Sequence, residues 1–202
     1  MRILVALGGN APRRGDAAKA GSSHSDTELA AREIAALALQ HEVVVCHDGY
    51  PQVRLLTLLQ NALPGHDIVT LLTEVVIGAD DPVPEPRAIA ELRSIRTLID
   101  AGVLVICAGG AAVALDGSGE MHGVEASIDE GLTAALLARR LDADLLLIFT
   151  EASSSGDSTG SQIEAARTFV AATEARAAIG HPMDAARLVS GEAGTQVSSP
   201  VG

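Results

Sequence analysis

Short runs of β-branched and other apolar residues alternate along the chain with longer segments rich in alanine and leucine. The short runs have the composition of strands, and the longer segments have the spacing of amphipathic helices. Strands are predicted at 2–7, 42–46, 68–77, 103–107, 145–149 and 176–179, and helices at 25–40, 51–62, 86–101, 128–141, 162–173 and 182–190. Ser25 and Glu28 have the spacing of a capping box for the first helix.

Two of the predicted strands contain no polar residue. Val103–Cys107 and Leu145–Phe149 are continuously apolar, which is typical of strands covered on both faces of a parallel sheet. With helices between the strands, the pattern predicts an α/β fold: a three-layer αβα sandwich around a mainly parallel central sheet. Residues 1–202 are predicted to form a single domain.

Charge and composition narrow the class of protein. The chain has 202 residues, with 14 basic and 26 acidic side chains and a net charge of −12, so it is a poor partner for nucleic acid or for an anionic membrane. The apolar run Ile3–Leu7 is too short for a signal segment, and glycines interrupt 101–115, so the cytoplasm is the expected location. Cys46 and Cys107 lie in apolar runs and are predicted to be reduced core thiols.

Glycine and polar residues gather where the predicted strands end. Gly8, Gly9 and Asn10 follow the first strand, and Gly109 and Gly110 follow the strand at 103–107. Such turns can present backbone N–H groups to an anion, although a tight turn that needs positive φ explains the glycines equally well. In a parallel sheet these ends share one edge, so a small-anion pocket is predicted there.

Histidine and metal chemistry are not indicated. His47 and Asp48 follow the second strand, but neighbours in sequence seldom face one another, and a polar turn is the better interpretation than an acid–base pair. The remaining histidines lack the spacing of metal ligands, so no metal site is predicted. No catalytic residue is assigned from the residues alone.

A series of longer motifs, in order, resembles carbamate kinases of the amino acid kinase superfamily. The motifs are VALGGNA (Val5–Ala11), the turn Pro51-Gln52-Val53, Asn61–Pro82, DAGVLVICAGG (Asp100–Gly110), Gly123–Ala138, Asp142–Thr150, Ile163–Gly180 and GEAGTQV (Gly191–Val197). The resemblance implies the αβα sandwich, a homodimer, and phosphate transfer between Mg-ATP and carbamate, running in fermentation toward ATP from carbamoyl phosphate and ADP. It also implies that Asp48 and Gly49 stand at the substrate-anion turn and that Asp129 and Thr150 lie on the nucleotide side.

The departures from this family pattern concern its chemistry. Where the family reads Ile-Asp-Lys-Asp-Leu, this chain has Ile128-Asp129-Glu130-Gly131-Leu132, and where it reads Gly-Pro-Lys-Val-Glu, this chain has Gly160-Ser161-Gln162-Ile163-Glu164. The family turn His-Gly-Asn-Gly-Pro-Gln-Val-Gly reads here as His47-Asp48-Gly49-Tyr50-Pro51-Gln52-Val53-Arg54. Its glycine-rich Gly-Gly-Gly-Gly-Ile-Pro-Val is replaced by Gly109-Gly110-Ala111-Ala112-Val113-Ala114-Leu115.

Segments of the family pattern are also missing. The gaps fall near Gln60–Asn61, between Asp81 and Pro86, and between Thr150 and Gly156, which implies loss of the protruding subdomain and of part of the nucleotide-binding region. Lys19 is the one lysine of the chain.

Three interpretations follow. The first is a degenerate carbamate-kinase-like pseudoenzyme, with weak or lost activity, that retains a carbamoyl phosphate or phosphate pocket. The second is an active kinase with rearranged groups, in which Arg54 or Arg87 supplies positive charge. The third is a non-catalytic regulatory or structural subunit, or another binder of a small anionic ligand.

Overall fold

The computed structural model describes residues 1–7, 20–47, 51–79, 84–107, 112–126, 128–150 and 160–199, with only the backbone described for 20–25 and 51. The helices are α1 (Ala20–Ala38), α2 (Pro51–Ala62), α3 (Leu92–Asp100), α4 (Glu130–Arg140), α5 (Gly160–Thr173) and α6 (Ala185–Ser190), with a short 3-10 turn at Pro182–Asp184 before α6. The strands are β1 (Arg2–Leu7), β2 (Glu42–Cys46), β3 (Ile68–Thr70), β4 (Val75–Gly78), β5 (Ala88–Ile89), β6 (Leu104–Cys107), β7 (Ala112–Leu115), β8 (Met121–Val124), β9 (Leu145–Phe149), β10 (Arg176–Gly180) and β11 (Thr195–Val197).

The larger sheet has seven strands in the order β11-β10-β9-β1-β2-β6-β3. Every neighbouring pair is parallel except β10 with β11. The continuous apolar runs of β1, β2, β6 and β9 account for this arrangement, because strands covered on both faces have no side that must stay polar. The predicted central parallel sheet is confirmed.

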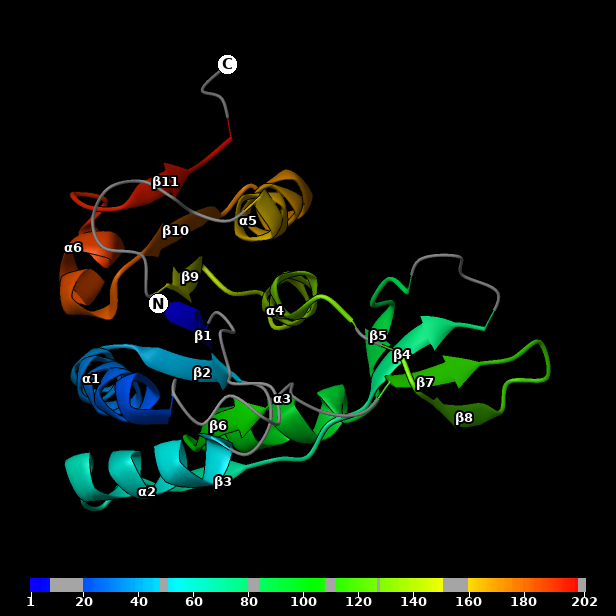
Figure 1. Cartoon of the computed structure of the whole chain (residues 1–202), viewed down its shortest axis with the longest axis horizontal. Coiled ribbons are helices and arrows are strands. Elements are labelled where there is room, and N and C mark those ends of the chain that lie inside the picture. Colours follow the sequence, from blue (N-terminus) through cyan, green and yellow to red (C-terminus); the bar gives the residue numbers. More distant parts are fainter. Residues whose placement is uncertain are drawn as a thin grey trace.

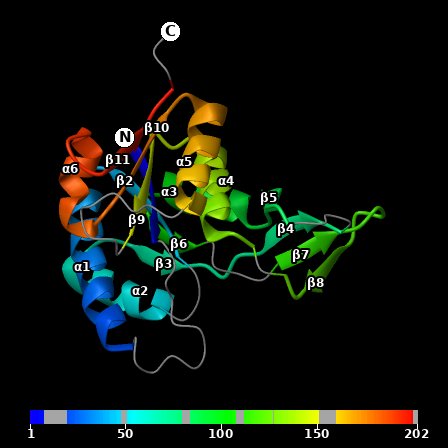
Figure 2. The same ribbon diagram turned by 45° about the horizontal axis from the view of Figure 1, so that its top comes forward.

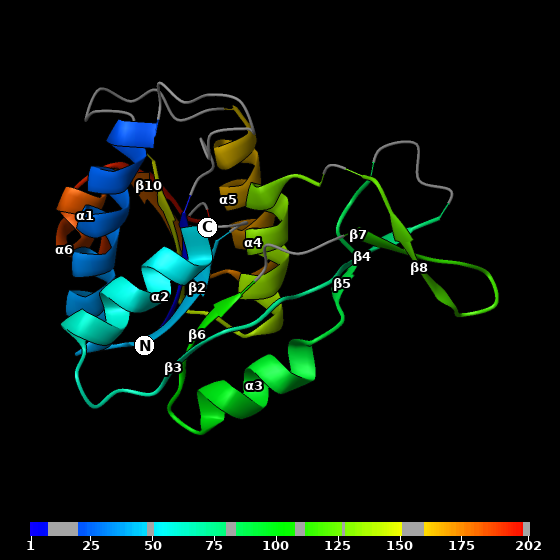
Figure 3. The same cartoon turned by 60° about the horizontal axis from the view of Figure 1, so that its bottom comes forward.

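Helices cover both faces of this sheet and enclose two apolar cores (Figure 1, Figure 3). Alternate residues of β1 point to opposite faces: Leu4 packs in the core under α3, α4 and α5, and Ile3 packs in the core under α1, α2 and α6. The αβα sandwich predicted from the alternation of strands and helices is therefore present.

A second sheet projects from one side of the sandwich (Figure 2). It has four strands in the order β5-β4-β7-β8. The single strand predicted at 68–77 is wrong, because β3 pairs with β6 in the central sheet whereas β4 pairs with β5 and β7 in the second one. The chain changes sheets in between, after the backbone N–H of Leu71 makes a last bond to the carbonyl of Ile106.

The predicted helix at 86–101 is also too long at its start. Ala88 and Ile89 form β5 opposite Val76 and Val75, so the helix begins only at Leu92. The predicted capping box is wrong as well, because α1 begins at Ala20 and Ser25 lies inside the helix. The cause of the first correction is the pairing of β5 with β4, because tertiary pairing decides short segments that local preference leaves open.

Cys46 and Cys107 are buried and are not joined in a disulfide, as predicted. They are register partners on the adjacent strands β2 and β6. Within the described part of the chain, no helix has the length and apolarity needed to cross a bilayer.

Candidate functional site

The carboxyl ends of the central strands line up along one edge of the sheet. Ala6 is in register with Cys46, Cys46 with Cys107, and Leu7 with Phe149, so the chain leaves β1, β2, β6 and β9 at adjoining positions. Ligands of open α/β sheets bind beyond this edge. We call it the carboxyl edge.

The predicted anion-binding residues follow these strand ends directly. Gly8, Gly9 and Asn10 come after β1, Asp48 and Gly49 after β2, and Gly109 and Gly110 after β6. All seven lie outside the described residues. The register of the preceding strands favours their convergence, which stays a prediction.

Thr150 and Asp129, the residues implied on the nucleotide side, are described. Thr150 follows β9, and its backbone N–H donates to the carbonyl of Gly180 at 2.9 Å, which places it between the ends of β9 and β10. Asp129 is the N-cap of α4, where its Oδ1 accepts from the backbone N–H of Leu132 at 2.9 Å. The Asp129 side chain therefore stabilises the start of α4, a structural role that was not predicted from the sequence.

The first turns of α4 and α5 pack closely. A Cβ atom at Gly131 would lie 3.1 Å from Asp129 Oδ1 and 3.1 Å from the Cβ of Ala165 in α5. Glu130 precedes it as the first residue of α4, where a carboxylate suits the positive end of the helix dipole. The start of α4 therefore carries a carboxylate at 130 and has little room for a side chain at 131.

The two arginines considered as replacement cations lie apart. Arg54 is in the first turn of α2, and its Nη2 lies 2.6 Å from Glu28 Oε1 of α1. Its Nε is buried and has no hydrogen-bond partner among the described residues. Arg87 precedes β5 in the second sheet, and its backbone N–H donates to the carbonyl of Val76.

One interaction at the carboxyl edge was missed from the sequence. Gln52, in the first turn of α2, donates through Nε2 to the carbonyl of His47 at 2.5 Å and accepts through Oε1 from the Thr70 hydroxyl at 3.0 Å. It is one of the few buried polar side chains in the described part of the chain. The sequence offered two signals for this residue: a glutamine just after a helix-opening proline, and the match of Pro51-Gln52-Val53 to the family turn.

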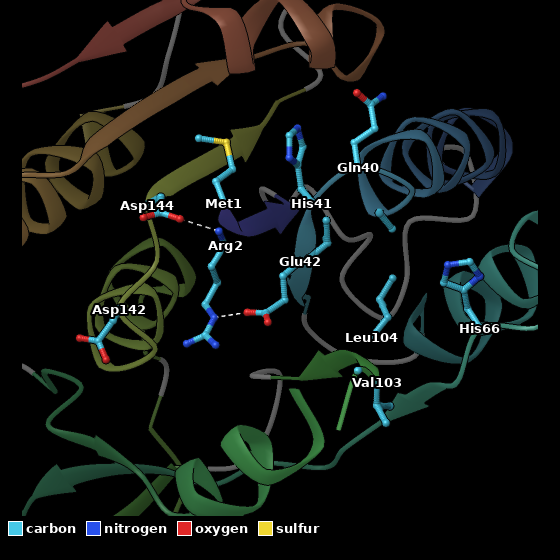
Figure 4. A pocket seen from close by; sticks show the side chains of 13 residues that line it. Met1, Arg2, Gln40, His41, Glu42, His66, Val103, Leu104, Asp142 and Asp144 are labelled. Carbon is cyan, nitrogen blue, oxygen red and sulfur yellow. Dashed lines mark hydrogen bonds and ion pairs between the residues drawn. The ribbon is translucent and has the colours of Figure 1, made fainter. Parts of the chain in front are cut away.

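A cavity of about 690 Å³ lies at the opposite, amino edge of the sheet (Figure 4). Arg2 occupies its centre, pairs with Glu42 and donates to the carbonyl of Leu141, while its backbone N–H donates to Asp144 at 2.6 Å. The hydrogen bond with Glu42 raises the pKa of Arg2. These polar groups pair with one another, so the cavity contains a network of hydrogen bonds and ion pairs where the strands begin. It is separate from the carboxyl edge.

A further polar cluster lies on the turn between β7 and β8. His122 Nε2 is 2.9 Å from Asp116 Oδ2 and 4.0 Å from Glu120, and Asp116 Oδ1 accepts from Ser118 and Glu120. The three side chains have the donor types of a metal site. The spacing of the histidines did not predict that His122 lies beside Asp116 and Glu120. Their interactions with one another stabilise the turn between β7 and β8.

The fold has clear counterparts among solved structures. Giardia carbamate kinase superposes with a TM-score of 0.83 at 22% identity, covering 98% of this chain and 99% of that chain. Giardia lamblia carbamate kinase bound to AMP-PNP gives 0.81 at 24% identity, covering 98% of each chain. An isopentenyl phosphate kinase gives 0.60 at 16% identity, covering 98% of this chain and 100% of that chain. These structures therefore share the αβα sandwich fold of this chain.

Sequence comparison identifies the family. The carbamate kinase of Rhizobium meliloti (strain 1021) is 31% identical over 303 residues, covering 98% of this chain and 94% of the relative. That of Haemophilus influenzae (strain ATCC 51907 / DSM 11121 / KW20 / Rd) is 27% identical over 300 residues, covering 98% and 97%. No protein-family model matches. The chain belongs to the carbamate kinase family.

The first alignment is longer than this chain. It runs over 303 residues, 101 more than the 202 present here, so internal stretches of the relative have no counterpart.

Proposed function

We propose that this protein is a carbamate kinase homologue with weak or lost phosphotransferase activity that retains a pocket for carbamoyl phosphate or phosphate at the carboxyl edge. The observation that carries the proposal is the packing at Gly131. The family pattern has Lys-Asp where this chain has Glu130-Gly131, and the space beside Gly131 is taken by Ala165 and Asp129. An aspartate at 131 would require these neighbours to yield by a few tenths of an ångström.

Electrostatics supports the same conclusion. Phosphoryl transfer depends on cations that offset charge on the transferred group and on the leaving oxygen. Glu130 brings a negative charge where the family pattern has a lysine, and Gln162 in the first turn of α5 is neutral. The net charge of −12 adds to the unfavourable field.

Nucleotide use is the less supported part of the proposal. A relative of the same fold binds AMP-PNP. The first turns of α4 and α5 adjoin, and the positive ends of two helix dipoles suit a phosphate. Asp129 fits a magnesium site less well, because its Oδ1 already caps α4. We therefore assign Mg-ATP or Mg-ADP no step in this protein, and keep Thr150 and Asp129 as its proposed neighbours.

The remaining features of the proposal concern the whole chain. We propose one carbamate-kinase-like domain over 1–202 that lacks the protruding subdomain, apart from the four-stranded sheet that projects from the sandwich, and part of the nucleotide-binding region, assembled as a homodimer in the cytoplasm. The alignment with the Rhizobium meliloti relative is 101 positions longer than this chain, which supports the missing segments.

The decisive experiment is ATP formation from Mg-ADP and carbamoyl phosphate by the purified, folded protein, with an authentic carbamate kinase as positive control. We expect no turnover above background, together with binding of carbamoyl phosphate in a calorimetric titration. Turnover comparable to the control contradicts the loss of activity. Absence of all binding contradicts the retained pocket.

An active kinase with rearranged groups is the second candidate. The buried Nε of Arg54, which has no partner among the described residues, favours it, because a guanidinium with a spare donor can donate to a phosphate oxygen in addition to Glu28. If turnover is found, Arg54→Ala should abolish it, whereas Arg87→Ala in the second sheet should leave it unchanged.

A further inference from the structure

The turn between β7 and β8 brings one imidazole and two carboxylates together. Asp116 follows β7, Glu120 precedes β8, and His122 is the second residue of β8. The ligand atoms that these three side chains offer all lie within 4.8 Å of one another. We call them the hairpin cluster. The turn lies at the end of the second sheet that points away from the sandwich, so the cluster is remote from the carboxyl edge (Figure 2).

The turn holds the Asp116 carboxylate in place through only one of its two oxygens. Oδ1 accepts from the backbone N–H and the hydroxyl of Ser118, at 2.8 and 2.6 Å, and from the backbone N–H of Glu120 at 3.0 Å. The backbone N–H of Asp116 donates to the carbonyl of Glu120 at 3.0 Å and completes the turn. The other oxygen, Oδ2, is left facing His122 at 2.9 Å.

The Glu120 carboxylate makes no hydrogen bond among the described residues. Its Oε2 is 4.0 Å from His122 Nε2, which is beyond hydrogen-bond distance, and the side chain is 78% exposed. Two carboxylates therefore face one imidazole nitrogen, and only that of Asp116 is close enough to bond with it. Two negative charges this close repel each other, and a cation bound between them turns the repulsion into attraction.

The spacing of the ligand atoms suits a small metal ion. A tetrahedral ion with bonds of about 2.0–2.1 Å holds its ligand atoms about 3.3 Å apart. The distances from His122 Nε2, 2.9 Å to Asp116 Oδ2 and 4.0 Å to Glu120 Oε2, lie on either side of this value. Closing the longer one requires Glu120, an exposed side chain, to move by less than about 1 Å. His122 ligates as the neutral tautomer that carries its proton on Nδ1.

The donor set selects among metals. Calcium and magnesium prefer sites made of oxygen ligands alone, whereas an imidazole beside carboxylates suits zinc. We propose that Asp116, Glu120 and His122 bind one zinc ion at the turn between β7 and β8, with water in the remaining position. The ion would join the two ends of the hairpin. This inference is independent of the proposed function, because it uses no residue of the carboxyl edge.

The test is a calorimetric titration of zinc into the full-length protein, free of any histidine tag and stripped of metal by a chelator. His122→Gln removes the ligand nitrogen but keeps an N–H donor for Asp116, and its matched control is His66→Gln, an exposed histidine between α2 and β3. Glu120→Gln removes the second carboxylate, and its control is Glu125→Gln, an exposed acid just after β8. Circular dichroism checks that each variant is folded.

We expect one zinc ion per chain, with affinity lowered about tenfold or more in His122→Gln and in Glu120→Gln and unchanged in both controls. Excess magnesium should not displace the zinc. Wild-type affinity in folded His122→Gln, or no zinc binding by the wild type, overturns the inference and leaves the cluster as an ion pair of the turn. Should His122→Gln not fold, Glu120→Gln decides, because its side chain makes no hydrogen bond among the described residues, and wild-type affinity there overturns the inference equally.

Discussion

At the scale of single residues, Gly131 separates this chain from the family pattern most clearly. We expect Gly131→Asp to lower the free energy of unfolding by about 1–3 kcal/mol, because the new Cβ is forced against Ala165 and Asp129. Gly160→Asp is the matched control: it places the same acid in the first turn of α5, where a Cβ meets nothing within 4 Å. Urea unfolding of both variants measures the difference, and equal stabilities would show that α4 yields without cost.

Asp129 can be tested for its two suggested roles at once. Asp129→Ala removes the N-cap of α4 and should cost about 1 kcal/mol of stability. Asp129→Asn keeps a capping oxygen and removes the charge, so its stability should stay near that of the wild type. If the asparagine variant loses nucleotide affinity while remaining stable, the carboxylate has a ligand role beyond capping, and if affinity is retained the residue is a cap alone.

The pKa of the Cys107 thiol is raised to about 12, chiefly by burial and then by the charge of Glu91. A thiol with a raised pKa stabilises the folded state fully below its ordinary pKa of about 9 and loses this contribution as pH rises toward 12. Between pH 8 and pH 10 the wild type should therefore lose about 1 kcal/mol more stability than Cys107→Ala. Urea unfolding at the two pH values tests this, and parallel losses would contradict it.

At the scale of elements, the turn between β7 and β8 depends on Asp116. Hydrogen bonds from the Ser118 hydroxyl, then from His122 and from the backbone N–H of Glu120, hold the pKa of this carboxyl well below its usual range. Its stabilising effect is therefore present above the ordinary carboxyl pKa and is lost as pH falls through the lowered one. We expect Ser118→Ala to raise the pKa of Asp116, read by NMR titration of its carboxyl carbon.

The control for this titration is Ser94→Ala, an exposed serine on α3, which should leave Asp116 unchanged. If Asp116 titrates in Ser118→Ala as it does in the wild type, the serine hydroxyl is not the main cause of its lowered pKa.

The individual strands show which parts of this fold sequence patterns can predict. The bounds of β1, β2 and β9 are confirmed because strands buried on both faces are uninterrupted apolar runs. The run at 68–77 misleads because nothing in its composition marks the point where the partner strand changes. β8 was missed because three of its four residues are exposed, so it lacks the pattern of a buried strand.

At the scale of the whole molecule, the site follows from sheet order more than from any motif. That glycine-rich segments follow strands could be read from the sequence, but that β1, β2 and β6 are adjacent and in register could not. The contact of Gln52 with Thr70 has the same origin: the residues are 18 positions apart and meet only because β3 takes the outer place beside β6. Long-range pairing has no local signature, and most of the site depends on it.

A ligand that binds only the folded chain must stabilise the whole sandwich, and this gives a test that needs no catalysis. At a concentration one hundred times its dissociation constant, a ligand adds about 2.7 kcal/mol to the free energy of unfolding. We expect carbamoyl phosphate to raise the melting temperature measurably and AMP-PNP to raise it less, because glycines follow β1, β2 and β6 in the sequence while Glu130 opposes a nucleotide phosphate. Removal of the charge at one position separates the causes: Glu130→Gln should increase the response to AMP-PNP and leave that to carbamoyl phosphate unchanged. If the wild type and Glu130→Gln respond equally to AMP-PNP, the loss of nucleotide affinity is caused by the missing segments and not by the negative charge at the start of α4.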